Sequence, residues 1–217
     1  MHVLITGATG FVGVGVLAEA LSAPAVTAVT VLGRRSTGIE HPKLTELLVD
    51  DMGDLSSVAH HLGAIDACFW CLGISSGGMD EATYTQITHT LTMHAARLLL
   101  EQNPDAHFCF LSGSGADGKA MWARVKKRTE DDLGALGFPG LVVFRPAFIR
   151  GLHGAQLRGT LYRLAYLVFT PFTPLIRRLG GATSNAEIGQ AMIVAVRDKM
   201  NGGILDSADI NEVASRL

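Results

Sequence analysis

The chain opens with an apolar run, Val3 to Thr6, that leads directly into a glycine-rich turn of sequence GATGFVG. A segment rich in Ala, Val and Leu follows, and we expect a helix over Phe11 to Ser22. Glycines at this spacing permit a tight turn and let the backbone approach a pyrophosphate, while the helix N-terminus offers N–H groups to the anion. This order predicts a dinucleotide-binding domain in which the turn contacts the cofactor through Gly7, Thr9, Gly10, Phe11, Val12 and Gly13.

Short apolar runs alternate with helical patterns along the rest of the chain. The expected strands are Val3–Thr6, Thr27–Leu32, Leu47–Val49, Ala67–Leu72, His107–Leu111 and Leu141–Phe144. The expected helices are Phe11–Ser22, Leu55–Leu62, Thr83–Glu101, Lys119–Leu136, Gln156–Leu179 with interruptions, Ala186–Lys199 and a short one near the C-terminus. Such alternation predicts an α/β fold, a Rossmann-type doubly wound parallel sheet of about seven strands.

We expect one domain over residues 1–217, with a nucleotide-binding core over 1–150 and a small substrate or lid region over 151–217 that includes the last strand and helices. The most apolar stretch lies in this second region, but Arg163, Pro171 and Pro174 interrupt it, so it is not expected to span a membrane. We favour a lid over the active-site cleft. Flanking arginines leave open a helix that contacts a partner or the surface of a membrane, namely Arg158, Arg177 and Arg178.

Composition restricts the partners. The formal net charge of −2 comes without a long basic run, so nucleic acid is not an expected partner and a small-molecule substrate is. Three cysteines are too few for a disulfide framework, and no cleavable signal precedes the first strand, so we expect a cytoplasmic protein.

No metal site is expected. Cys68 and Cys71 have CxxC spacing, but both lie in a buried-strand pattern, where residues three apart point to opposite faces. The histidines lack metal-ligand spacing with supporting carboxylates, including the His60-His61 pair and His89 with His94.

Charged residues follow the second and third strands. Arg34 and Arg35 stand where a carboxylate is expected if the 2′-hydroxyl of NAD is bound, and two guanidinium groups suit the 2′-phosphate of NADP, so NADP(H) is favoured over NAD(H). The alternative is a pair of solvated surface arginines. Asp50 and Asp51 are placed to accept a hydrogen bond from the adenine amino group, or they are caps of a loop.

Seven linked motifs resemble those of the atypical short-chain dehydrogenase/reductase family over nearly the whole chain: GATGFVG, GRR, VDD, CLG, LSGSGAD, WARVK and RPAFI. In detail the chain is similar to the small NAD(P)-binding branch that includes the Tat-interacting oxidoreductase and bacterial proteins labelled as epimerases. The resemblance implies that Leu72 and Gly73 line the path from adenine to ribose, and that Pro146 and Ile149 contact the carboxamide. It also implies a homodimer through the long helices.

The same resemblance implies the catalytic residues. Ser114, with Ser112 as the alternative, would bind the substrate carbonyl or hydroxyl, and Lys126 would hold the nicotinamide ribose. The tyrosine that normally precedes this lysine by one helical turn is replaced by Trp122. An indole N–H does not release a proton at neutral pH, so the usual general acid is missing. Candidate substitutes outside the family positions are Tyr84, Tyr162, Tyr166 and His153.

Trp122 lies one turn from Lys126, so the two side chains share a helix face, and Trp122 fills the pocket or forms an aromatic wall unless it is simply a core residue. Three functions follow. The first is an NADP(H)-dependent oxidoreductase acting on a small carbonyl or quinone-like compound, and the second is a catalytically silent NADPH-sensing module. A nucleoside-diphosphate-sugar epimerase is less favoured, because the region after Pro146 is small.

Overall fold

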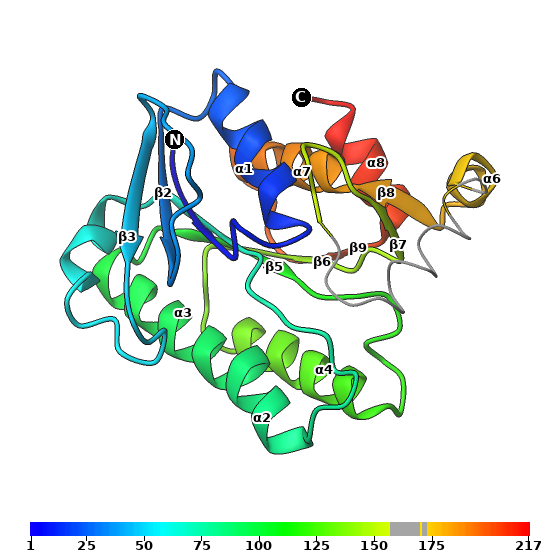
Figure 1. The fold of residues 1–217 in the computed structure, drawn as a ribbon, viewed down its shortest axis with the longest axis horizontal. Coiled ribbons are helices and arrows are strands. Elements are labelled where there is room, and N and C mark those ends of the chain that lie inside the picture. Colours follow the sequence, from blue (N-terminus) through cyan, green and yellow to red (C-terminus); the bar gives the residue numbers. More distant parts are fainter. Residues whose placement is uncertain (157–169, 171–172) are drawn as a thin grey trace.

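A parallel sheet with helices on both faces forms the centre of the molecule (Figure 1). The computed structural model describes residues 1–156, 170 and 173–217. Its main sheet has seven strands in the order β3-β2-β1-β4-β5-β6-β9. Their bounds are β1 His2–Thr6, β2 Ala28–Gly33, β3 Leu44–Leu48, β4 Ala67–Trp70, β5 His107–Leu111, β6 Gly140–Phe144 and β9 Ile204–Leu205. All neighbours pair in parallel, which confirms the predicted doubly wound fold.

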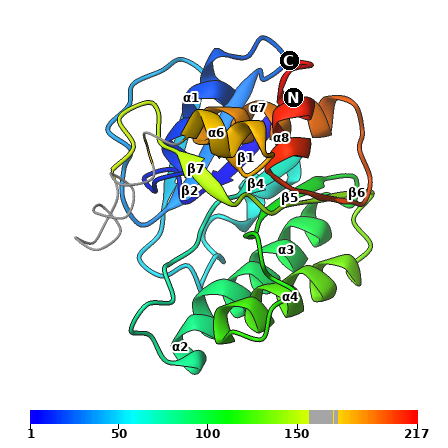
Figure 2. The same ribbon diagram turned by 90° about the vertical axis from the view of Figure 1, so that its right-hand side faces the viewer.

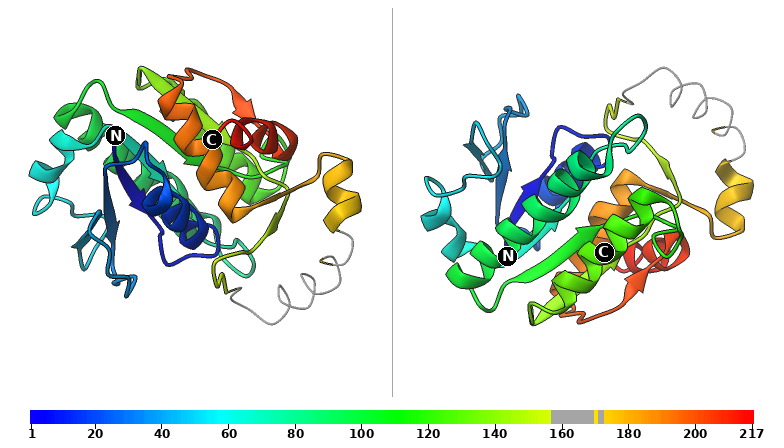
Figure 3. Two further views of the ribbon diagram at one scale, coloured as in Figure 1. Left: turned by 90° about the horizontal axis from the view of Figure 1, so that it is seen from above. Right: turned by 90° about the horizontal axis from the view of Figure 1, so that it is seen from below.

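The helices divide between the two faces of the sheet (Figure 2). One face carries α1 (Gly13–Ser22), α7 (Asn185–Arg197) and α8 (Ser207–Ala214), which bury one apolar core against it. The other face carries a second core under a continuous helical run and α4 (Met121–Gly134). Figure 3 shows these two layers in turn, from above and from below. Because both faces are covered, the central strands are apolar on both sides, as the continuous apolar runs predicted.

The helical run over residues 81–102 has three parts: α2 (Glu81–Thr85), the π-helical turn η2 (Gln86–Thr90) and α3 (Leu91–Gln102). The Asp80 carboxylate caps its start by accepting a hydrogen bond from the Thr83 N–H at 2.9 Å. The sequence predicted this helix but not its π turn. The helix expected over Leu55–Leu62 is wrong: the segment forms only the 3₁₀ turn η1 (Ala59–Ala64), because Asp54 accepts a hydrogen bond from Ser56 N and begins a local turn.

Two further elements lie beyond β6. A small second sheet pairs β7 (Phe148–Arg150) with β8 (Ala182–Ser184) in parallel. It was not predicted, because strands of this length show no period in the sequence. Ser184 then caps α7 through a reciprocal box in which its N–H donates to the Glu187 carboxylate and its hydroxyl accepts from Glu187 N.

The segment expected as a lid helix, Gln156–Leu179, falls largely outside the described residues, apart from α6 (Thr173–Arg178). Among the helices that the structure describes, none is long and apolar enough to cross a membrane.

Candidate dinucleotide site

The strand order reverses between β1 and β4, so the carboxyl ends of these two strands open a crevice at a topological switch point. The glycine turn follows β1 and Leu72 follows β4. Thr6, at the end of β1, is fully buried, and its hydroxyl accepts a hydrogen bond from Leu72 N at 3.3 Å. The fold therefore brings the turn and the Leu72-Gly73 segment to the same point.

The three glycines of the turn are each required by close backbone approach. Gly7 has φ +67°, and a Cβ there would lie 2.6 Å from the Cys71 carbonyl oxygen. A Cβ on Gly13 would lie 2.1 Å from the Gly7 carbonyl oxygen. Gly10 donates to that same oxygen at 2.8 Å. The turn is folded so tightly that no side chain fits at Gly7 or Gly13, which leaves the backbone there open to a ligand, as a pyrophosphate-binding turn requires.

Two arginines lie at the end of β2 beside this turn. Both side chains are exposed, and Arg34 forms no ion pair with the part of the chain that the structure describes. The Arg35 guanidinium reaches the Thr9 hydroxyl at 3.5 Å, so it lies against the glycine turn. Two positive charges thus stand at the place where the sequence predicts a 2′-phosphate.

Glu46 of β3 holds the loop that carries these arginines. Its carboxylate accepts hydrogen bonds of 2.6 Å from Ser36 Oγ, Thr37 N and Thr37 Oγ1. These bonds favour the ionised form and lower the pKa of Glu46 below its usual value. The sequence analysis missed this residue, because its role depends on the register between neighbouring strands.

The two aspartates after β3 differ. Asp51 accepts a hydrogen bond from Gly53 N at 2.8 Å, so it caps a turn, which was the alternative to adenine binding. Asp50 is exposed and makes no side-chain hydrogen bond with the described residues.

The opposite wall of the crevice is built by α4 and the loop after β5. Three side chains spaced four residues apart on α4 meet consecutive parts of that loop. Glu130 accepts a hydrogen bond from Ser112 Oγ, and Lys126 Nζ donates to the Leu111 carbonyl at 2.9 Å. The Trp122 ring lies beside Gly113 and Gly115, where a Cβ on Gly115 would be 3.6 Å from it. The structure therefore brings Trp122, Lys126 and the Ser114 loop together.

Lys126 is a partly buried cation of this wall. Its ammonium lies 5.2 Å from the centre of the Phe110 ring. Burial lowers the pKa of Lys126 to about 8, against the opposing effect of the Glu130 carboxylate. The side chain therefore titrates within reach of physiological pH.

The two candidate serines have different surroundings. Ser112 is buried and its hydroxyl is engaged by Glu130. Ser114 is exposed, and its N–H donates to the Pro146 carbonyl at 3.0 Å, so Pro146 lies beside it. This arrangement leaves the Ser114 hydroxyl accessible to a ligand and assigns Ser112 to the support of the loop.

A buried ion pair holds this loop from below. Arg145, which precedes Pro146, donates to both oxygens of Glu130 and also to the carboxylate of Asp117. Arg145 and Glu130 are 8 % and 6 % exposed, so both charges are compensated inside the protein. The sequence analysis missed this pair. Glu130 stands one helical turn beyond Lys126 on the same face, and that spacing was the available signal.

The candidate substitutes for the missing tyrosine lie elsewhere. Tyr84 is buried in α2, and burial raises its pKa. His153 has φ +56° and its Nε2 lies 3.0 Å from the Glu19 carboxylate of α1. Tyr162 and Tyr166 lie outside the described residues. None of the described candidates has a contact with Ser114 or Lys126.

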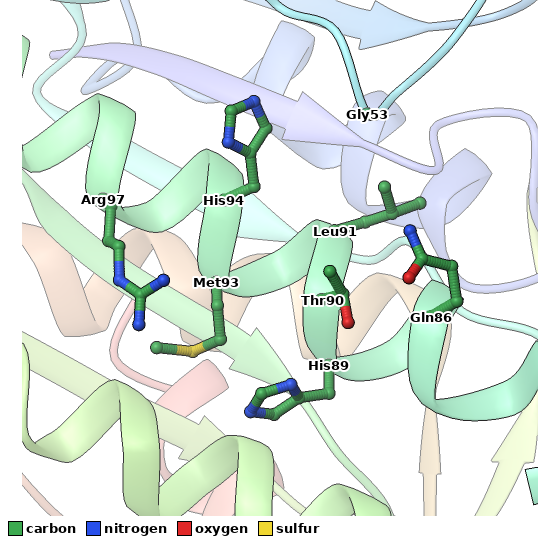
Figure 4. Close-up of a pocket in the computed structure, with 8 residues that line it drawn as sticks. All are labelled: Gly53, Gln86, His89, Thr90, Leu91, Met93, His94 and Arg97. Atoms are coloured by element: carbon green, nitrogen blue, oxygen red, sulfur yellow. The ribbon is translucent and has the colours of Figure 1, made fainter. Parts of the chain in front are cut away.

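A pocket of about 380 Å³ lies along the helical run, away from these site residues (Figure 4). His94 and Gln86 point toward the Gly53 loop, whereas His89 points the other way and contacts the Asp132 carboxylate of α4 at 2.6 Å. Within the described ranges, no group of three His, Cys, Asp or Glu side chains could hold a metal ion.

A parallel sheet with a glycine turn at its switch point defines a Rossmann-type dinucleotide-binding domain. Residues 3–133 match the model of the NAD dependent epimerase/dehydratase family. The chain belongs to this family, whose fold is of the short-chain dehydrogenase type that the sequence motifs resemble.

Curated relatives are fungal proteins. The chain is 30% identical over 160 residues to "Protein fmp52, mitochondrial" of Aspergillus clavatus, which covers 69% of this chain and 67% of the relative. It is 31% identical over 156 residues to "Protein fmp52-1, mitochondrial" of Aspergillus oryzae, covering 68% and 65%. The matches thus span about two thirds of these relatives. Because the relatives are named as mitochondrial proteins, the cytoplasmic location expected from the sequence is wrong.

Solved structures share the fold at low identity. The Bordetella bronchiseptica enzyme WbmH in complex with NAD+ aligns with a TM-score of 0.70 at 18% identity, over 94% of this chain and 74% of that chain. A short chain dehydrogenase family protein from Francisella tularensis aligns with a TM-score of 0.66 at 18% identity, over 96% and 98%. The second has nearly the same extent as this chain, without the additional length of the first.

Proposed function

We propose that the chain binds a nicotinamide dinucleotide in the crevice between β1 and β4, and NADP(H) in preference to NAD(H). The observation that carries this proposal is the glycine turn, where a Cβ on Gly7 or Gly13 would overlap backbone atoms at the switch point. Gly7, Thr9, Gly10, Phe11, Val12 and Gly13 would hold the pyrophosphate, with Leu72 and Gly73 beside the ribose, Asp50 near the adenine, and Pro146 and Ile149 near the carboxamide. Asp51 would stand beside Asp50, with one of its carboxylate oxygens held by Gly53 N.

The preference for NADP(H) rests on Arg34 and Arg35. Arg34 has no carboxylate partner among the described residues. The Glu46 carboxylate accepts hydrogen bonds from Ser36 and Thr37 and forms no ion pair with Arg34. Two exposed guanidinium groups beside the turn favour a phosphomonoester over a ribose hydroxyl.

The reaction that this site supports best is oxidation or reduction of a small carbonyl or quinone-like compound. When bound, the dinucleotide would supply or accept the hydride. Ser114 would orient the substrate oxygen, Lys126 would hold the ribose, and Trp122 would form one wall of the pocket. The Lys126 ammonium, with its pKa lowered to about 8, holds a proton far more acidic than an indole N–H and is the proposed proton source.

The second candidate is a module that binds NADPH without turnover and signals to a partner. Trp122 favours it, because the usual general acid is absent while the glycine turn is kept. Turnover separates the two functions.

Titration of the protein with NADPH and NADH, followed by nicotinamide fluorescence, tests cofactor binding. We expect tighter binding of NADPH. We expect the double variant Arg34→Ala/Arg35→Ala to lose about 100-fold or more in affinity for NADPH only, because each of the two charged contacts contributes about 1.5–3 kcal/mol. Arg216→Ala, in the C-terminal tail, is the matched control. Equal affinity of the wild type for both cofactors contradicts the NADP(H) preference, and no binding of either contradicts the whole proposal.

Consumption of NADPH with a panel of aldehydes, ketones and quinones tests catalysis. A restored general acid contributes about 10²–10⁴-fold, so Trp122→Tyr is expected to raise turnover if the pocket is catalytic. Turnover by the wild type excludes the silent module. If neither protein consumes NADPH with any compound although both bind it, the oxidoreductase proposal is wrong and the sensing module stands.

A further inference from the structure

We propose that Asn185 is a positioning residue that fixes the pyrophosphate-binding turn from behind; this inference rests on the proposed dinucleotide site. Asn185 is the first residue of α7, directly after the capping residue Ser184. It lies far from the glycine turn in sequence, and no motif pointed to it. Its side chain is 0 % exposed, so its hydrogen bonds are all made inside the protein.

The Asn185 amide joins two loops. Its Nδ2 donates to the Phe11 carbonyl at 3.1 Å and to the Leu152 carbonyl at 3.1 Å. Its Oδ1 accepts from Leu152 N at 2.8 Å. Both amide hydrogens and the oxygen are therefore used, which fixes the orientation of the group. The glycine turn and the segment after β7 are held by the same side chain.

The Asn185 side chain packs closely against α1. A Cβ on Gly15 of α1 would lie 2.4 Å from Asn185 Cγ and 2.8 Å from its backbone carbon, so the third residue of α1 has to be a glycine. A Cβ on Gly151, the residue before Leu152, would lie 2.6 Å from the Phe11 ring. Phe11 is thus held by its carbonyl and by its ring.

The consequence concerns a backbone donor. In a trans peptide, the carbonyl of one residue and the N–H of the next point in opposite directions. Asn185 holds the Phe11 carbonyl toward α7, so the Val12 N–H is directed away from α7. No described backbone oxygen accepts a hydrogen bond from Val12 N. Asn185 therefore sets the direction of a donor that the proposed pyrophosphate contact requires.

If Asn185 positions the Val12 N–H, its substitution affects only some ligands, whereas a residue that merely supports the fold affects all of them. A misdirected Val12 N–H weakens only ligands that carry a 5′-phosphate or a pyrophosphate. Adenosine 2′-monophosphate carries the adenosine end and the 2′-phosphate without either group. Its affinity should depend on Arg34 and Arg35 and not on Asn185, provided that the domain stays folded.

The experiment compares wild type, Asn185→Ser and Asn103→Ser in calorimetric titrations with NADPH and with adenosine 2′-monophosphate. Asn103 is the matched control, because its Nδ2 donates to the Ile65 carbonyl at 2.9 Å, before the start of β4 and so at the opposite edge of the sheet. We expect Asn185→Ser to weaken NADPH binding by about tenfold, because one preorganised donor is lost, and to change binding of the monophosphate by less than about twofold. Asn103→Ser should change neither.

The remaining outcomes decide the matter. Equal weakening of both ligands, or of neither, overturns the positioning role. If Asn185→Ser does not fold, Gly151→Ala is titrated in its place, because its Cβ would lie 2.6 Å from the Phe11 ring and displace Phe11. Gly151→Ala must show the same split between the two ligands, and an equal effect on both overturns the proposal. A wild type that binds neither NADPH nor NADH instead refutes the proposed function itself.

Discussion

The two walls of the crevice are built in different ways. The wall formed by the glycine turn depends on backbone, since a Cβ on Gly13 would lie 2.1 Å from the Gly7 carbonyl oxygen. The wall formed by the Ser114 loop depends on buried charge, since Arg145 binds Glu130 beneath it and Asp117 beside it. The first wall requires that side chains be absent, and the second requires that each charge keep its partner.

This difference determines how each wall fails. A side chain added to the backbone wall has to displace main-chain atoms, so ligand binding is lost at once. A partner removed from the charged wall leaves a buried ion uncompensated, so stability is lost first. Substitutions in the backbone wall are therefore expected to lower ligand affinity more than stability. Substitutions in the charged wall are expected to lower stability more than ligand affinity.

Gly13→Ala has the largest expected effect. Its Cβ would meet two backbone carbons and one oxygen of Gly7 and Ala8 within 2.9 Å, so the turn must open. We expect the affinity for NADPH to fall by about 100-fold, or about 2.7 kcal/mol, in a fluorescence titration. Gly134→Ala, at the end of α4 with open space around it, should leave affinity unchanged. Retained NADPH affinity in Gly13→Ala would show that the turn is not the anion site.

Glu130→Ala sharpens the comparison from the other wall. It leaves the buried Arg145 with only the exposed Asp117 as partner, so we expect a loss of about 3 kcal/mol and a fall in Tm of about 6–12 °C in a thermal melt. Affinity for adenosine 2′,5′-bisphosphate should stay within about twofold. The neighbouring Asp131→Asn removes an exposed ion pair with Lys127 and should cost about 0.5 kcal/mol or less. If the two variants are equally stable, the buried pair does not support the loop.

The backbone wall could be predicted from the sequence and the charged wall only in part. Gly7, Gly10 and Gly13 lie close together in the chain, so their spacing alone predicts the turn without knowledge of any tertiary contact. The doubly wound parallel sheet could be predicted for a similar reason, since alternating strands and helices allow few connections. Lys126 and Trp122 were placed on one face of α4 by helical spacing, and the structure shows them there.

Hydrogen bonds and ion pairs between residues that are distant in the sequence could not be predicted in this way. Arg145 with Glu130, Glu46 with Thr37, and Asn185 with Phe11 each join elements that only the folded sheet brings together. Ser112 and Ser114 could not be separated by sequence, because the choice depends on which hydroxyl Glu130 engages. The short strands β7 and β8 and the π turn η2 gave no periodic signal.

Lys126→Met is expected to change stability in the opposite direction to Glu130→Ala, and the sign of the change is the informative quantity. Burial lowers the pKa of Lys126 from 10.5 to about 8. The protonated lysine is therefore less stable in the folded protein than in the unfolded chain. Below pH 8 the wild type bears this cost in full, and between pH 8 and 10.5 its stability should rise as the folded lysine loses its proton first.

Lys126→Met should therefore be more stable than wild type at pH 7, by up to about 3 kcal/mol, and the advantage should vanish toward pH 10.5 in denaturant melts. Lys127→Met, an exposed neighbour whose pKa the Asp131 carboxylate raises, should show no such gain. NADPH affinity should move the other way and fall in Lys126→Met only. If Lys126→Met raises the stability of the protein and lowers its affinity for NADPH, the lysine serves ligand binding. Stability alone would favour the apolar side chain at this position. If Lys126→Met is instead less stable than wild type at pH 7, Lys126 stabilises the Ser114 loop, as Glu130 does.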